Sequence, residues 1–192
     1  MGILVLGLVL FLGVHSIRIF AGGWRDVQVA RLGEQRWKGA YSIASLAGFA
    51  LLVWGFGLAR TEPVVLYAPP AWARHASALP ILPAFVLLAA AYVPGTRIKA
   101  AVGHPMVAGT VLWALGHLRA NGRLADLLLF GGFGLWAALS FLAARGRDRA
   151  AGRAYPPGPA SRDAVALAVG VAAWAAFAFV AHGWMFGVRP FG

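Results

Sequence analysis

The chain contains an uncharged apolar run at residues 1–17, which reads MGILVLGLVLFLGVHSI. Such a run is long enough to cross the hydrocarbon core of a bilayer as an α-helix, because a crossing takes about 17–25 residues. No basic segment precedes it and no small-residue cleavage pattern follows it, so we expect a helix of the mature protein rather than a signal peptide. The run predicts a membrane protein.

Five further apolar runs follow the first one. They lie at residues 39–59, 77–96, 100–118, 127–144 and 164–188. None alternates with the two-residue period of a membrane β-barrel, and helices satisfy their own backbone groups in lipid. The sequence therefore predicts an all-α fold, a polytopic integral membrane helix bundle of about six transmembrane helices in one domain, residues 1–192. The third run contains Pro80, Pro83 and Pro94 and is expected to be broken or partly re-entrant.

The composition excludes a soluble or disordered chain. Hydrophobic residues make up 60% and charged residues 12% of the sequence, whereas soluble domains carry about 25% charged residues. The absence of cysteine excludes disulfides, thiolate nucleophiles, cysteine-ligated metal centres and covalently attached haem. The net charge of +11 is explained by basic loops between apolar runs, so no nucleic-acid partner is expected and the surroundings are a lipid bilayer.

The distribution of lysine and arginine predicts the orientation. Residues 25–38, 97–99 and 145–162 carry eleven of these cations, in the loops after the first, third and fifth runs. The opposite loops carry five, which are Arg60, Arg74, Arg119, Arg123 and Arg189. Because cytoplasmic loops are the ones enriched in lysine and arginine, both termini are expected to lie outside the cytoplasm.

Histidines are the notable titratable side chains within the runs. His15 lies in the first run, His104 and His117 in the fourth, and His182 in the sixth. No Asp, Glu, Lys or Arg lies deep in a run, which argues against a proton pump, a voltage sensor or a carboxylate-based transporter. Four imidazoles without a carboxylate partner indicate ligands of a metal or a haem. The alternative for each is a packing histidine that is hydrogen-bonded to a backbone carbonyl.

The depth of these histidines in the membrane suggests which two of them could ligate the same iron. At about 1.5 Å of rise per residue, His15 and His104 lie near the cytoplasmic ends of their helices, and His117 and His182 near the outer ends. About 20 Å of helix separates His104 from His117, a spacing that suits two stacked haems. These two side chains also lie roughly 140° apart on an ideal helix, and Pro105 is expected to kink it. The ligand pairing stays open on this basis.

Two residues outside the runs are interpreted as surface groups. His75 lies between the second and third runs and is expected to be exposed. Glu34 precedes the second run and is expected to form an ion pair with Arg31 or Lys38.

Five motifs in this chain resemble the NnrU family, and the resemblance covers nearly the whole sequence. They are LGVHSIR at 12–18, RLGE at 31–34, GHPMVAG at 103–109, WALGH at 113–117 and AHGW at 181–184. The block from His104 to His117 is the most specific of them. It also resembles the membrane-bound 15-cis-zeta-carotene isomerases, a distant branch of the same superfamily.

The resemblance implies properties that composition and spacing do not show. NnrU proteins are associated with nitrite and nitric-oxide reduction in denitrifying bacteria, which implies the bacterial inner membrane and reductase components as partners. The isomerase branch holds a non-covalent haem b, and its iron-ligating histidines would match His15 and His117. Its cysteine three residues before the second histidine is replaced here by Ala114, so a thiolate ligand is impossible at that site.

Three functions compete on this evidence. The first, which we expect, is a haem b protein of the NnrU type that serves nitrogen-oxide reduction, with His15, His117, His104 and His182 as candidate haem-binding residues. The second is a haem-dependent cis–trans isomerase that acts on an apolar polyene within the bilayer. The third is a cofactor-free membrane assembly protein whose histidines are packing residues.

Overall fold

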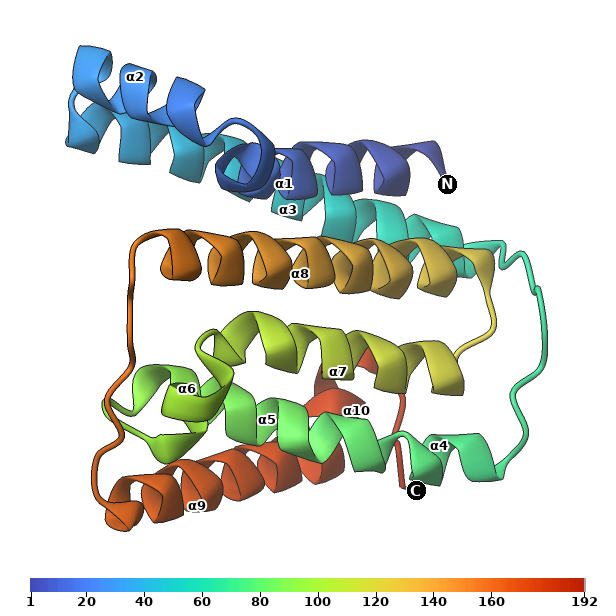
Figure 1. Ribbon diagram of the computed structural model, residues 1–192. Coiled ribbons are helices and arrows are strands. Elements are labelled where there is room, and N and C mark those ends of the chain that lie inside the picture. The colour runs from blue at the N-terminus through green and yellow to red at the C-terminus, as the bar shows by residue number, and fades with distance from the viewer. Residues whose placement is uncertain (192) are drawn as a thin grey trace. The chain divides into compact units, whose positions relative to one another are not determined.

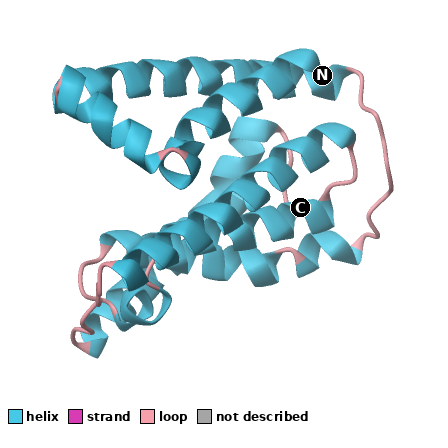
Figure 2. Cartoon of the chain, turned by 45° about the horizontal axis from the view of Figure 1, so that its top comes forward, coloured by secondary structure: helices cyan, strands magenta, loops and turns pink. Residues whose placement is uncertain are grey.

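The computed structural model describes residues 1–191, which are helical almost throughout (Figure 2). Within that range the one β pairing is an isolated bridge between Val65 and Arg123. Five helical stretches of the described chain are long and apolar enough to cross a membrane. They are Gly2–Phe20, Glu34–Thr61, Trp72–Tyr92, Leu124–Ala150 and Ala160–Phe186. The predicted all-α membrane fold is confirmed.

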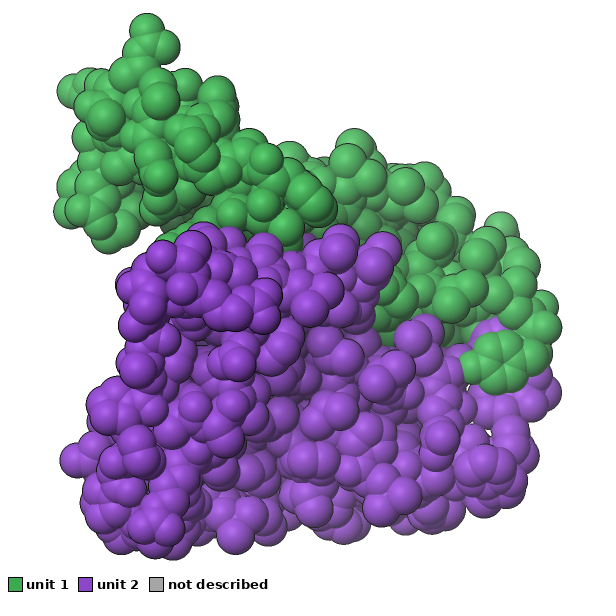
Figure 3. Space-filling view, viewed as in Figure 1, with its two compact units in different colours: residues 1–67, 123–132 green, residues 68–122, 133–192 purple. Residues whose placement is uncertain are grey.

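The chain forms two compact units, shown in different colours in Figure 3. The first unit comprises residues 1–67 and 123–132, and the second comprises residues 68–122 and 133–192. Helix α8 (Leu124–Ala150) contributes its beginning to the first unit and its remainder to the second. His15 therefore belongs to the first unit, and the other intramembrane histidines belong to the second.

The first unit is built on a close contact between two long helices (Figure 1). These are α1 (Gly2–Phe20) and α3 (Glu34–Thr61). Three glycines lie at the contact, at positions 7, 48 and 55. A Cβ atom added at Gly55 would overlap the backbone nitrogen of Leu4, and one added at Gly48 would lie 2.7 Å from the backbone nitrogen of Phe11. Small residues allow membrane helices to approach this closely.

A short helix, α2 (Gly22–Leu32), occupies a segment that the hydropathy pattern assigns to a loop. It has no buried residue. It ends at Gly33, whose φ of 79° lies in the region that favours glycine, and α3 begins at the next residue. The rings of Trp24 and Trp37 meet edge to face at 5.8 Å and hold α2 against α3. The first basic loop is thus largely a helix on the surface of this unit.

The second unit places α5 at its centre, in contact with α7 and α9 (Figure 1). Its elements are α4 (Trp72–Ala76), α5 (Ala78–Tyr92), α6 (Arg97–Val102), α7 (Pro105–Ala120), α9 (Ala160–Ala176), a π-helix η1 (Phe177–Ala181) and α10 (His182–Phe186). Glycines again permit the approach. A Cβ atom added at Gly170 of α9 would lie 2.6 Å from the Cα of Val86, and one added at Gly109 of α7 would lie 2.9 Å from the carbonyl oxygen of Ala84.

Proline has a different effect in each of the two runs that contain it. In the third run the expected break is wrong, because α5 continues through Pro83 and ends at Tyr92. In the fourth run the expected kink at Pro105 is wrong, because α6 ends before Gly103, whose φ is 79°, and Pro105 begins a new helix. Proline is favoured at the first helical position because its missing N–H would have no partner there.

The break divides the fourth apolar run. Helix α7 has 16 residues and is about 24 Å long, which is why it falls below the length of the five candidate spans. His104 occupies the N-cap position of α7, without a capping hydrogen bond from its side chain, instead of lying inside a continuous helix. The two histidines of this run are therefore in different surroundings, one at a helix start and one in its last turn.

Candidate functional site

His15 is held in a fixed orientation on α1. Its Nδ1 lies 2.7 Å from the carbonyl oxygen of Phe11, one helical turn earlier. Its ring packs on the Phe11 ring at 4.2 Å and meets the Tyr41 ring edge to face at 5.3 Å. A ring nitrogen at this distance from a carbonyl donates its proton, so the lone pair of the neutral imidazole is on Nε2.

His117 has the same local arrangement near the end of α7. Its Nδ1 lies 2.9 Å from the carbonyl oxygen of Trp113, four residues earlier, and the two rings are 4.8 Å apart. The lone pair is again on Nε2. Histidines that bind metals commonly donate their second N–H to a carbonyl or carboxylate, which fixes the ring and makes the ligating nitrogen more basic. His15 and His117 both have this feature, which is also the one expected of packing histidines.

His182 is anchored differently. Its Nδ1 lies 2.6 Å from the carbonyl oxygen of Val188, which comes later in the chain. The π-helix Phe177–Ala181 directly precedes it, and such wide turns are frequent at functional sites because they shift the register of the side chains that follow. His182 and His117 both belong to the second unit.

His104 has a carboxylate partner that the sequence pattern does not predict. Its Nε2 lies 2.7 Å from Oδ2 of Asp148, and the hydroxyl of Tyr155 donates to the same oxygen at 3.0 Å. The expectation that no intramembrane histidine has a carboxylate partner is therefore wrong for His104. Asp148 lies 44 residues away at the polar end of α8 and is 7% exposed. A signal was present, because Asp148 is a lone acid among the arginines of residues 145–153.

The cluster of His104, Asp148 and Tyr155 joins three segments of the second unit: the start of α7, the end of α8 and the loop before α9. Burial raises the pKa of Tyr155, and its hydrogen bond to Asp148 raises that pKa further. The phenol therefore stays protonated and remains a donor. With Nε2 directed at Asp148, His104 is a structural group that links these segments.

Replacing Asp148 with asparagine is expected to lower the free energy of unfolding by about 2 kcal/mol, because hydrogen bonds to a charged group are worth about 1.5–3 kcal/mol each. The melting temperature of the purified protein in mild detergent measures the effect. Asp26→Asn is the matched control, since Asp26 is 72% exposed and pairs with Arg25 at the surface. Equal melting temperatures for the two variants would show that the cluster does not stabilise the fold.

A haem and a bare metal ion differ in the number of protein side chains that they require as ligands. Within residues 1–191 no group of three or more His, Cys, Asp or Glu side chains is placed to hold a metal. A haem iron takes four donors from its porphyrin and needs one or two axial side chains, for which an imidazole nitrogen is a common choice. The anchored imidazoles of His15 and His117 each fit that role within their own unit.

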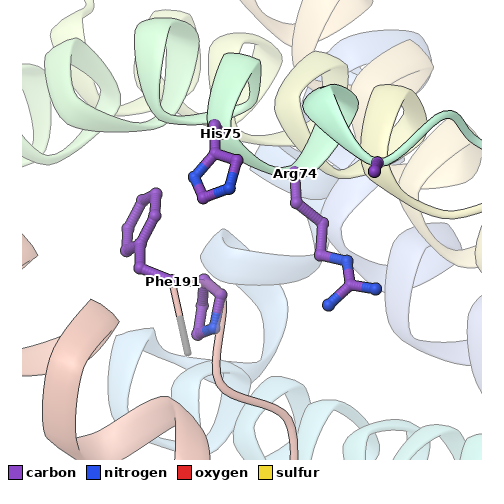
Figure 4. A pocket seen from close by; sticks show the side chains of 5 residues that line it. Arg74, His75 and Phe191 are labelled. Atoms are coloured by element: carbon purple, nitrogen blue, oxygen red, sulfur yellow. The ribbon is translucent and has the colours of Figure 1, made fainter.

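His75 lies apart from these histidines, at a pocket of about 270 Å³ in the second unit (Figure 4). Its exposure agrees with the sequence analysis. Its ring stacks on that of Phe191 with centroids 5.9 Å apart, and Figure 4 shows these rings facing each other across the pocket. Pro190, Ala71 and Arg74 complete the lining. His75 therefore provides a control for substitutions of the membrane histidines.

The fold and these histidines define the class: an all-α protein with several apolar helices that suggest a bilayer environment, and with oriented imidazoles within its apolar runs. A family model described as NnrU protein matches residues 3–190. The chain therefore belongs to the NnrU family. No curated protein and no solved structure matches it.

Proposed function

We propose that this NnrU-family protein binds haem b in the membrane, with Nε2 of His15 and Nε2 of His117 as the candidate axial ligands. One observation carries the proposal: of the four described intramembrane histidines, these two share an Nδ1 bond to the carbonyl four residues earlier, at 2.7 and 2.9 Å. That bond leaves the basic nitrogen on the far side of each ring. The same two positions match the iron-ligating histidines of the isomerase branch that the sequence resembles.

The chain's own residues would orient the ligands and set their basicity. The carbonyls of Phe11 and Trp113 hold the two rings, and Ala114 excludes a thiolate at the second position. Haem b, when bound, supplies a redox-active iron whose potential depends on its axial ligands. With family membership, this supports a role in nitrite or nitric-oxide reduction during denitrification, beside reductase components of the same membrane.

Haem binding is tested by the absorption spectrum of the purified full chain. The wild type is expected to show a Soret band, with sharp α and β bands on reduction. His15→Ala is expected to lower the ratio of haem to protein by at least about tenfold, because it removes an axial ligand. His75→Ala, which changes an exposed and stacked ring, is expected to leave that ratio unchanged.

Two other outcomes would change the assignment. A wild-type protein without a Soret band after expression with ample haem would contradict haem binding altogether. If His182→Ala loses haem while His15→Ala keeps it, the iron is ligated by His117 and His182. The same spectra therefore test both the cofactor and the choice of ligands.

The proposed location is the bacterial inner membrane, with both termini outside the cytoplasm. The eleven-to-five distribution of cations supports this orientation. It requires α7 to cross the membrane despite its 16 residues, because five crossings would place the termini on opposite sides. A C-terminal reporter that folds only outside the cytoplasm is expected to be active, and a reporter active only inside would contradict the orientation.

A further inference from the structure

A pocket of about 260 Å³ lies in the first unit, where the end of α1, the start of α2 and the start of α3 meet. Figure 1 shows these three helices next to one another. The charged side chains of its lining are Arg18, Arg25, Glu34 and Lys38, and its large aromatic side chains are Trp37 and Tyr41. The pocket therefore combines cations with aromatic walls.

The lining has a positive balance, with three cations and one carboxylate. Glu34 pairs with Lys38 at 2.7 Å, which confirms one of the two partners expected from the sequence. Arg25 pairs with Asp26, which lies outside the lining, at 2.8 Å. Both carboxylates are about 70% exposed, and exposed ion pairs contribute about 0–1 kcal/mol. An anion that enters the pocket can therefore replace the carboxylates as the partner of Arg25 and Lys38 at a small cost in free energy.

The pocket lies where apolar sequence gives way to charged sequence on two helices. The uncharged run of α1 ends at Arg18, and that of α3 begins at Gly39, directly after Lys38. This change of composition is typical of the level of the lipid headgroups, where Trp and Tyr side chains are also enriched. Phosphate groups are the anions that concentrate at this level.

We infer that this pocket binds the phosphate group of an anionic phospholipid, with Arg25 and Lys38 pairing to the phosphate oxygens. Its volume is below the roughly 300–1,000 Å³ of pockets that enclose drug-sized molecules. It therefore admits a headgroup while the acyl chains stay in the bilayer. Basic pockets beside membrane helices recognise anionic headgroups in this way. His15, one of the proposed haem ligands, also lines this pocket, so the test below includes the haem content as a readout.

The test measures lipid binding to the purified full chain by native mass spectrometry. The probes are short-chain phosphatidylglycerol, short-chain phosphatidylcholine of the same acyl length, and glycerol phosphate without acyl chains. Phosphatidylglycerol is expected to bind at least about fivefold more tightly than phosphatidylcholine, which carries no net charge. Glycerol phosphate is expected to bind more weakly than phosphatidylglycerol, because it lacks the anchoring chains.

Three single variants give the test a direction and a control. Arg25→Gln is expected to weaken phosphatidylglycerol binding by roughly fivefold, the effect of one cation near an anionic surface. Glu34→Gln is expected to strengthen it, because the carboxylate competes for Lys38. Arg31→Gln removes an exposed cation of the same helix α2 outside the pocket and is expected to have no effect.

Several results would overturn the inference. Equal binding of the two lipids would do so, as would equal losses in Arg25→Gln and Arg31→Gln, because a general charge effect would then suffice. Glycerol phosphate binding as tightly as phosphatidylglycerol would assign the pocket to a soluble phosphate instead. Loss of haem in Arg25→Gln would assign its cations to the carboxylates of that cofactor.

Discussion

Gly55→Ala is expected to lower the free energy of unfolding of the first unit by about 3 kcal/mol or more. The new Cβ would overlap the backbone nitrogen of Leu4, so the helices α1 and α3 must separate along their contact. Overpacking of a core that can adjust its side chains costs about 1–3 kcal/mol, and a backbone atom has less freedom to move. Leu4, which is fully buried, and Leu52 would lose part of their packing.

Gly57→Ala is the matched control, two residues along the same helix. Its Cβ would meet nothing within 4 Å, so it is expected to stabilise the helix by roughly 0.5–1 kcal/mol through helix propensity. The two variants therefore have opposite expected signs for the same chemical change. Melting temperatures in mild detergent measure both. Similar stability of the two variants would show that α1 and α3 are not in close contact in the folded protein.

His117→Ala is expected to remove haem, or to change it from low to high spin, while His104→Ala keeps it. His117 presents Nε2 from a ring held by the Trp113 carbonyl, whereas the Nε2 of His104 faces Asp148. Loss of an axial ligand is expected to lower haem occupancy by at least about tenfold. His104→Ala is expected instead to lower the melting temperature, as Asp148→Asn does, without changing the spectrum.

The paired readout separates a ligand from a structural histidine. If His104→Ala changes both the absorption spectrum and the melting temperature, Asp148→Asn serves as the comparison. Asp148→Asn destabilises the same cluster but leaves all imidazoles in place. If His104→Ala loses haem and Asp148→Asn does not, His104 is the ligand and the assignment of roles is reversed. If His104→Ala and His117→Ala each lose half of a two-haem complement, two stacked haems are present.

The apolar runs predicted most of the helices because burial in lipid demands long uncharged segments. The positions of the helix ends depend on side-chain contacts and turns, which a hydropathy pattern does not show. Helix α2 forms from a polar segment through the Trp24–Trp37 contact and the turn at Gly33, neither of which has a hydropathy signal. Pro105 in an apolar run predicts a kink, whereas the positive φ of Gly103 allows the chain to start a new helix there.

Depth along a helix predicts that His117 and His182 lie at the same level, and this stays a prediction. Depth could not predict the partner of His104, because Asp148 reaches it through the fold of a distant helix end. The anchoring of His15 by Phe11 depends on a side-chain rotamer. The pocket beside His15 needs three helices in place, and residue types alone do not reveal it.

The glycine contact between α1 and α3 also has a consequence for how the protein is made. All of its partners lie within the first 61 residues, so the pair can close while the ribosome is still adding the later helices. Synthesis proceeds at about 5–20 residues per second, which leaves several seconds before the last helix emerges. The outward faces of α1 and α3 carry large apolar side chains such as Leu6, Ile43 and Leu46. This pair of helices can therefore enter the bilayer already packed, before the later helices are made.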